Sequence, residues 1–174
     1  MNGDGAPPHM TSVVAAMQYT GPTRHLIASL KYEGVYQVAE VCAKLIYYSA
    51  AIPVHDLIIP VPLHPNRLLR RGFNQAEAVA TELGKLTGAP CLNALQRTRH
   101  LAPQAQVKDR QERLTRLGGS FVLDVTYREQ LNAATSILLI DDVFTTGATL
   151  STCAEALQTH TSADIHGLTI AHGV

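Results

Sequence analysis

The sequence predicts a single α/β domain whose central, mostly parallel sheet is flanked by helices. Short apolar runs rich in β-branched residues, such as residues 137–140, are typical of strands covered on both faces. These runs alternate with segments whose apolar residues recur every three or four positions, as in amphipathic helices. Strands that alternate with helices along the chain favour a parallel sheet with helices on its faces.

The composition limits the class of protein. The chain has 174 residues, of which 46% are hydrophobic, and a formal net charge of zero, which fits one globular domain with a substantial core. No apolar run approaches the roughly 20 residues that span a bilayer, and no secretory signal pattern begins the sequence. We therefore expect a cytoplasmic protein with no membrane contact. We interpret Cys42, Cys91 and Cys153, which form no CxxC pair, as reduced core residues.

The expected elements follow one another without repeats or a second domain. Residues 1–10 are expected to be a disordered end, and residues 11–174 to form the domain. We expect strands at residues 12–19, 56–61, 91–95, 120–125, 136–140 and 165–171. We expect helices at residues 22–31, from about 35 to 46, at 74–87 and at 150–157, and a loop at residues 64–72.

Basic residues gather in two connecting segments. One segment contains Arg67, Arg70 and Arg71. The other contains Arg97, Arg99, Lys108, Arg110, Arg113 and Arg116. This concentration indicates a local anionic ligand, although a solvated basic face is the alternative. The second segment, residues 97–118, exceeds the length of an ordinary connection, about 12 to 15 residues, which favours a lid over a site.

The stretch SILLIDDVFTTGATLSTCAEAL, residues 136–157, carries the clearest functional signal. A buried strand leads into two carboxylates, then a turn of threonines around Gly147, then a helix. In open α/β sheets this position, at the carboxyl end of a central strand, binds ligands. Two carboxylates can accept hydrogen bonds from a vicinal diol, whereas threonine hydroxyls and the N-terminus of a helix favour an anion. A diol site beside a phosphate site describes a ribose 5-phosphate.

Three other interpretations fit less well. A P-loop needs GxxxxGK[ST], and neither that spacing nor its lysine is present. A dinucleotide-binding fold needs GxGxxG near its first strand, which Gly3 and Gly5 do not provide. A simple helix cap accounts for one aspartate and one threonine but not for the whole pattern.

The segment IDDVFTTGATL resembles the phosphoribosyl-pyrophosphate (PRPP) signature of the type I phosphoribosyltransferases. PVPLHPNRLLRRGFNQAEAVA, residues 60–80, is similar to the ComF (competence protein F) branch of that family. So are YTGPTRHLIASLKYEG, residues 19–34, and RTRHLAPQAQVKDRQERLTRLGGSF, residues 97–121. The four motifs occur in the family's order. The resemblance implies a type I phosphoribosyltransferase-like fold with a small N-terminal hood around residues 17–31.

The resemblance also implies residue roles. Asp141 and Asp142 would hold the ribose hydroxyls and contribute to catalysis. The wider PRPP-binding set would be Asp141, Asp142, Val143, Thr145, Thr146, Gly147, Ala148 and Thr149. The pyrophosphate side would be formed by Pro62, Leu63, His64, Arg67 and Arg71. Lys108 and Arg110 would be catalytic lid residues. Mg²⁺ would be the cofactor, held near Asp141 and Asp142 mostly through water.

The activity that the resemblance implies is pentosyl transfer, a glycosyltransferase reaction of nucleotide metabolism. Phosphoribose would pass from PRPP to an unidentified acceptor base or nucleophile with release of pyrophosphate, through positioning and electrostatic stabilisation. The alternative is a non-catalytic PRPP-binding module that regulates or assembles DNA uptake, with a competence protein as partner. A homodimer is a further expectation from the wider family.

We do not expect direct binding of nucleic acid. Three Phe, six Tyr and no Trp leave little aromatic surface for base stacking. Two departures from the family pattern bear on function. Full-length relatives usually begin with a cysteine-rich zinc-binding module, whose cysteines this sequence lacks, and Arg116 stands where the family tends to carry asparagine.

Overall fold

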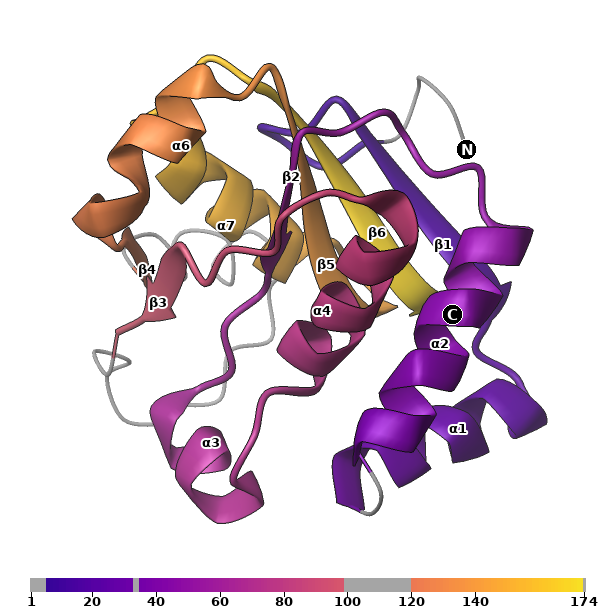
Figure 1. Cartoon of the computed structure of the whole chain (residues 1–174). Helices are drawn as coiled ribbons and strands as arrows, with labels where there is room; N and C mark the ends of the chain where they lie inside the picture. Colours follow the sequence, from indigo (N-terminus) through magenta and orange to yellow (C-terminus); the bar gives the residue numbers. More distant parts are fainter. Residues whose placement is uncertain (1–5, 33–34, 99–119, 174) are drawn as a thin grey trace.

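The structure is a computed structural model that describes residues 6–32, 35–98 and 120–173 (Figure 1). Its centre is a four-stranded, all-parallel sheet in the order β1-β6-β5-β2. The strands are β1 (Ser12–Gln18), β2 (Leu57–Pro60), β5 (Ser136–Phe144) and β6 (Asp164–His172). The α/β fold class and the parallel central sheet are therefore confirmed.

Helices cover both faces of the sheet (Figure 1). One face packs against α1 (Gly21–Tyr32), α2 (Val35–Ser49) and α4 (Gln75–Thr87). The other face packs against α7 (Ala148–Gln158) and, further along, α6 (Arg128–Ala133). A short antiparallel ribbon of β3 (Leu95–Arg97) and β4 (Phe121–Leu123) lies beside α3 (Pro65–Arg71), and a 3₁₀ turn (Val125–Tyr127) leads into α6.

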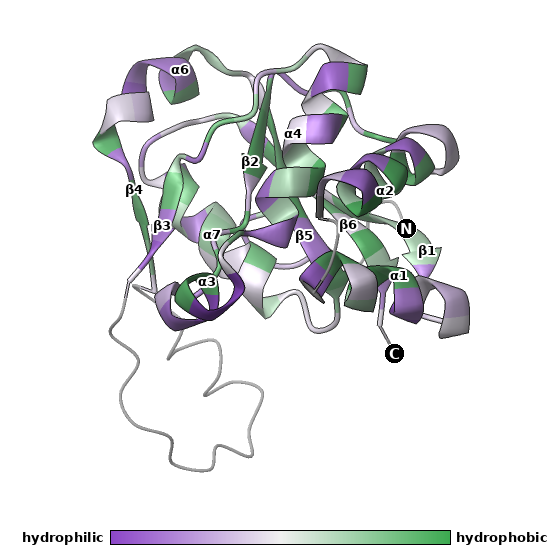
Figure 2. Ribbon diagram, turned by 60° about the horizontal axis from the view of Figure 1, so that its bottom comes forward, coloured by the Kyte–Doolittle hydropathy of each residue, from purple (hydrophilic) through white to green (hydrophobic). Residues whose placement is uncertain are grey.

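The continuous apolar run of β5 follows from its central position. Leu138 and Ile140 belong to the core on the α1, α2 and α4 side, whereas Ile137 and Leu139 belong to the core on the α7 side. All four side chains are fully buried, because successive residues of a strand point to opposite faces and both faces are covered. Figure 2 shows hydrophobic residues along these strands and many hydrophilic residues in α3.

Several boundaries differ from those we expected. The predicted loop at residues 64–72 contains α3, which begins at Pro65 with His64 as its N-cap and ends at Gly72 with φ 82°. That prediction was wrong because α3 buries none of its residues and therefore has no apolar periodicity. The strand predicted at residues 91–95 is reduced to a bridge between Cys91 and Ile58, with β3 starting at Leu95.

β5 is longer than the expected strand at residues 136–140. It continues through both aspartates to Phe144, whose partner in β6 is His172. Backbone pairing with β6 does not require apolar side chains, so the polar residues that follow Ile140 remain in the sheet. The three cysteines are free thiols, as expected, and Cys42 and Cys153 are buried.

Residues 7–10 have defined contacts in place of the disorder that we expected over residues 1–10. The carbonyl of Pro8 accepts a hydrogen bond from Ser151 Oγ at 3.0 Å. The carbonyl of His9 accepts one from Gln158 Nε2 at 3.2 Å. Both donors belong to α7, so this segment lies along that helix; residues 1–5 lie outside the described residues. Within the described ranges, none of the helices has the length and apolarity that a membrane crossing requires.

The apolar side chains of the central strand β5 are fully buried at residues 137–140. Leu139 is fully buried, and we expect Leu139→Ala to lower the free energy of unfolding by about 2–5 kcal/mol, because it removes apolar burial and leaves a cavity. Leu69, in α3, is 87% exposed, and Leu69→Ala should change the free energy of unfolding by about 0.5 kcal/mol or less. Urea unfolding of both variants checks the difference; equal losses would contradict this account of the core.

Candidate functional site

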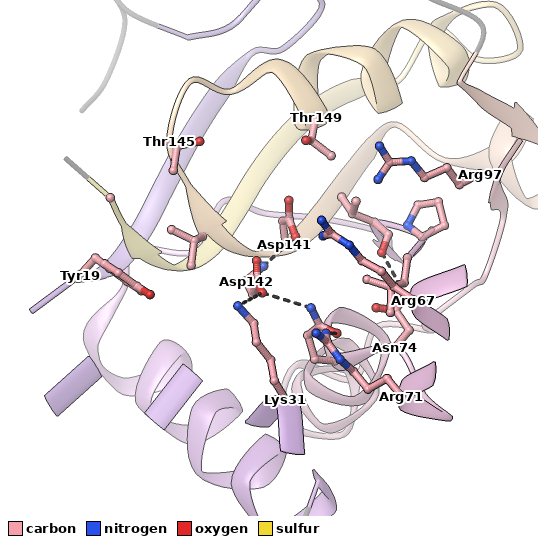
Figure 3. A pocket seen from close by; sticks show the side chains of 16 residues that line it. Tyr19, Lys31, Arg67, Arg71, Asn74, Arg97, Asp141, Asp142, Thr145 and Thr149 are labelled. Atoms are coloured by element: carbon pink, nitrogen blue, oxygen red, sulfur yellow. Dashed lines mark hydrogen bonds and ion pairs between the residues drawn. The ribbon is translucent and has the colours of Figure 1, made fainter. Parts of the chain in front are cut away.

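A cleft of about 480 Å³ opens at the carboxyl edge of the sheet, where β2 ends at Pro60 and the neighbouring β5 continues to Phe144. This is the position at which open α/β sheets bind ligands. Side chains from the hood, the loop after β2, α3, α4, β3, β5 and α7 line it (Figure 3). The lining residues are Tyr19, Lys31, Val61, Pro62, Leu63, Arg67, Arg71, Asn74, Gln75, Arg97, Asp141, Asp142, Val143, Thr145, Thr149 and Gly173.

The two carboxylates lie at the centre of the cleft, with the other labelled side chains around them (Figure 3). Asp141 Oδ1 accepts a hydrogen bond from the backbone N–H of Asp142 at 2.8 Å. Burial raises the pKa of Asp141 to about 7, and the neighbouring charge of Asp142 adds to that rise. Asp141 therefore exchanges a proton near neutral pH, at a position where a ligand can reach it.

Asp142 is held by donors from two helices. Lys31, at the end of α1, places Nζ 3.2 Å from Asp142 Oδ2. Gln75, at the start of α4, donates from Nε2 to the same oxygen at 3.1 Å. The Gln75 amide oxygen in turn accepts from Arg71 Nη1 at 2.5 Å. Four side chains from three separate segments of the sequence thus form one connected network.

The turn between β5 and α7 forms one side of the cleft. Gly147 has φ 73°, and a Cβ there would lie 2.5 Å from Pro7 Cγ and 2.9 Å from Phe144 Cε2, so both conformation and space favour glycine. Thr145 and Thr149 line the cleft, next to the first free N–H groups of α7. Thr146 is not in the lining, and its Oγ1 accepts a hydrogen bond from the N–H of Ala148 at 3.4 Å.

Three arginines, Arg67, Arg71 and Arg97, also line the cleft, and we call them the arginine cluster (Figure 3). Arg97 belongs to β3, and its guanidinium carbon lies 5.2 Å from the ring centroid of Phe121, its partner in β4. Its Nε is buried and has no hydrogen-bond partner, and burial lowers the pKa of this guanidinium. No ion pair in the described residues involves these arginines.

Most of the predicted site residues line this single cleft. Those that do are Asp141, Asp142, Val143, Thr145, Thr149, Pro62, Leu63, Arg67 and Arg71. Thr146, Gly147 and Ala148 form the turn behind the lining, and His64 accepts a hydrogen bond from the N–H of Asn66 as the N-cap of α3. Lys108 and Arg110 lie outside the described residues, so their predicted roles stay predictions.

The sequence interpretation missed Lys31 and Gln75 as site residues, and it assigned Arg97 to a lid. All three lie in segments that resemble the ComF pattern, and that resemblance is the one signal that could have singled them out. Lys31 and Gln75 each contact Asp142, which lies 111 and 67 positions further along the chain, respectively, and no local periodicity encodes such pairs. Tyr19, beside Gly173, lines the hood end of the cleft.

Asp141 and Asp142 could hold a magnesium ion through water and ligand oxygens, but not through a full set of protein ligands. Within the described ranges, no group of three or more His, Cys, Asp or Glu residues could hold a metal. Asp142 Oδ2 is already engaged by Lys31 and Gln75. Magnesium usually retains several waters and binds through one or two carboxylates together with substrate phosphates. The pair at 141 and 142 fits that mode and does not form an all-protein cage.

Comparison with known proteins places the chain in a family, although no family model matches the sequence. The chain is 32% identical over 161 residues to competence protein F of Haemophilus influenzae, covering 87% of this chain and 68% of that protein. The chain belongs to the competence protein F family. It is also 28% identical over 167 residues to the DNA utilization protein YhgH of Salmonella typhi, covering 91% of this chain and 71% of the relative.

A third family member is more distant, and the solved structures define the fold. Competence protein ComFC of Streptococcus pneumoniae is 26% identical and is covered over 64% of its length. Glutamine PRPP amidotransferase from B. subtilis, complexed with ADP and GMP, superimposes with a TM-score of 0.53 at 15% identity. That match covers 78% of this chain and 26% of the larger enzyme chain. The fold of this ComF family member is therefore that of the type I phosphoribosyltransferases.

The raised pKa of Asp141 predicts a pH-dependent stability. A carboxyl group whose pKa rises on folding stabilises the fold fully below its ordinary pKa of 3.8, and this stabilisation is lost as the pH rises through about 7. Asp141→Asn has no such titration, so its melting temperature should increase relative to wild type between pH 5 and pH 8. Thermal unfolding across that range measures the change.

Asp124→Asn is the control for this measurement. Hydrogen bonds from Thr126 lower the pKa of Asp124, so its stabilising contribution is lost only as the pH falls through that lowered value. The difference in melting temperature between this variant and wild type should be constant from pH 5 to pH 8. A constant difference for Asp141→Asn as well would show that Asp141 is not protonated in the fold near neutral pH.

Proposed function

We propose that this ComF family member binds PRPP with Mg²⁺ in the cleft and transfers its phosphoribose to an acceptor. The observation that carries the proposal is the distribution of charge within one cleft. Two carboxylates occupy the centre, and threonine hydroxyls at a helix N-terminus and the arginine cluster line the same cleft around them (Figure 3). PRPP has the same order of groups, with a 5-phosphate, a vicinal diol and a pyrophosphate on one sugar.

The central carboxylates suit the sugar. Ionised carboxylates accept hydrogen bonds and offer about four lone-pair sites each, so the pair at 141 and 142 can accept from both ribose hydroxyls. The hydroxyls of Thr145 and Thr149, with the N–H groups at the start of α7, suit the 5-phosphate. Asp141 and Asp142 are the carboxylates that would hold a magnesium ion, mostly through water, and the ion would neutralise part of the ligand's charge.

The arginine cluster suits the pyrophosphate. Three guanidinium groups that line one cleft repel one another, and a partly buried cation without a carboxylate is costly unless an anion accompanies it. Arg97 in particular has a buried Nε with no hydrogen-bond partner. A guanidinium that already lies in place against Phe121 can stabilise the charge that develops on the leaving group without reorganising.

The acceptor would bind at the hood end of the cleft, which the sugar, the 5-phosphate and the pyrophosphate do not occupy in this proposal. Tyr19 points into the cleft from the side opposite Arg97 (Figure 3), and Lys31 lies between the hood and Asp142. In the reaction, the bond from C1 to the pyrophosphate oxygen breaks and its electron pair leaves with pyrophosphate. A bond from C1 to the acceptor atom forms. The chain's own residues bind and orient the two reactants and exclude water, and no covalent nucleophile is required.

A second candidate is PRPP binding without turnover, in a regulatory or assembly role. The names of the relatives, which refer to competence and DNA utilization, favour this candidate, and it uses the same cleft. Release of pyrophosphate in the presence of candidate acceptors separates the two functions. The predicted catalytic roles of Lys108 and Arg110 apply to the transferase alone.

Calorimetric titration with PRPP and Mg²⁺ tests the shared part of both candidates. We expect saturable binding to wild type and an affinity at least about tenfold weaker, or about 1.4 kcal/mol, for Asp141→Asn/Asp142→Asn, because an amide cannot replace a charged acceptor. Asp124→Asn, which changes a carboxyl group outside the cleft, should leave the affinity unchanged. A folded wild type without PRPP affinity would contradict the proposal.

The arginine cluster makes a separate prediction. Arg97→Met keeps an apolar side chain against Phe121 but removes the charge, so we expect a loss of affinity for inorganic pyrophosphate of about tenfold or more, a typical effect of removing a charged partner. Arg128→Met, in the distant helix α6, should bind pyrophosphate like wild type. Calorimetry with pyrophosphate measures both, and equal affinities for the two variants would exclude Arg97 from the site.

A further inference from the structure

We infer that Gln75 is a positioning residue that transmits the state of Arg71 to the sugar-binding carboxylate of Asp142. The inference rests on the proposed function, because it assigns the sugar to Asp142 and the pyrophosphate to the arginine cluster. It concerns the RRGFNQ segment, residues 70–75, in which the sequence interpretation saw mainly the start of a helix. The geometry shows a second role, a polar connection between two ends of the cleft.

The connection has a defined chemical direction. Arg71 Nη1 donates to Gln75 Oε1 at 2.5 Å, and Gln75 Nε2 donates to Asp142 Oδ2 at 3.1 Å. A guanidinium can only donate, and an ionised carboxylate can only accept. The amide of Gln75 therefore satisfies both neighbours in one orientation alone, with its oxygen toward Arg71. Gln75 is 6% exposed, so water does not readily substitute for either contact.

The connection fixes one oxygen of Asp142. Oδ2 receives Gln75 from α4 and Lys31 from α1. Lys31 and Gln75 both contact this one oxygen, and Asp142 lines the cleft. A carboxylate anchored through one oxygen cannot rotate freely, so its other oxygen is available to a ligand hydroxyl at little entropic cost. Gln75 thereby orients the group that receives the sugar.

The backbone of the RRGFNQ segment keeps this geometry. Gly72 ends α3 in the left-handed conformation with φ 82°, and Asn74 begins α4 by accepting a hydrogen bond from the N–H of Ala76 at 3.1 Å. Asn74 Nδ2 also donates to the carbonyl of Val61 at 3.0 Å. The turn between the two helices is therefore tied to the loop after β2, and Arg71 and Gln75 face each other across it.

This arrangement predicts an effect at a distance. Ribose 5-phosphate has no pyrophosphate, so it presents no group for the arginine cluster. Loss of the Arg71 side chain should nevertheless weaken its binding, because Gln75 would lose the contact that orients its amide. If Gln75 transmits the effect, removal of Gln75 should cancel it. A purely structural role for either residue predicts no such dependence.

Calorimetric titrations with ribose 5-phosphate test this with four proteins: wild type, Arg71→Met, Gln75→Met and the double variant. Methionine retains an unbranched apolar side chain at both positions and removes their hydrogen bonds. We expect each single variant to bind about fivefold more weakly or worse, within the usual range of coupling between sites. The double variant should bind no more weakly than Gln75→Met alone, which is the signature of a shared interaction. Arg71→Lys, which retains a donor, should restore most of the affinity.

Gln130→Met, in α6, is the matched control and should bind within about twofold of wild type, with thermal unfolding confirming that each variant is folded. If Gln75→Met is unstable, the pair Arg71→Met and Arg71→Lys still decides the question, because Arg71 lies at the end of a helix that buries no residue. If the losses of binding free energy in Arg71→Met and Gln75→Met add up in the double variant, or if Arg71→Met binds ribose 5-phosphate like wild type, the inference about Gln75 is overturned and the proposed function is not affected. A wild-type protein that binds PRPP but not ribose 5-phosphate would also overturn only the inference about Gln75. A wild-type protein that binds neither ligand would contradict the proposed function as well.

Discussion

The burial of two adjacent carboxylates at the end of an apolar strand is the constraint on which the rest of the site depends. β5 carries Asp141 and Asp142 into a position from which bulk water is largely excluded, and their mutual repulsion is strong there. The fold relieves this cost in two ways. Asp141 takes up a proton readily, as its pKa of about 7 indicates, and Asp142 is compensated by Lys31 and by Gln75. The helices α1 and α4, which cover the same face of the sheet, must therefore both reach this strand.

The two faces of the sheet contribute differently to the site. The face covered by α1, α2 and α4 supplies the donors that hold Asp142, and the α7 face supplies the turn with Thr145 and Thr149. The arginine cluster comes from α3 and from the β3–β4 ribbon at the margin of the sheet. Groups of opposite charge thus line one cleft, and no ion pair in the described residues joins the arginine cluster to either aspartate. A ligand with several charged groups can therefore interact with both the aspartates and the arginine cluster at once.

Much of the fold and the centre of the site could be predicted from the sequence, because both have local signals. The run at residues 137–140 marks a strand buried on both faces, and the aspartates and Gly147 follow it within a few positions. α3 was not predicted because it has no buried face and therefore no apolar periodicity. The extension of β5 to Phe144 was not predicted because backbone pairing with His172 does not depend on the polarity of the side chains. Lys31, Gln75 and Arg97 take their roles from contacts across the fold, which a single sequence does not display.

The titration of Asp141 has a consequence for the energetics of any complex formed in the cleft. A ligand that needs this group as an anion must expel a hydrogen ion to the solvent near pH 7. The heat of association will then include the ionisation heat of the buffer, and the observed dissociation constant will decrease as the solution becomes more alkaline, up to the point at which the side chain is fully ionised beforehand. The fraction of protein that carries such a ligand therefore depends on pH through the protonation of Asp141.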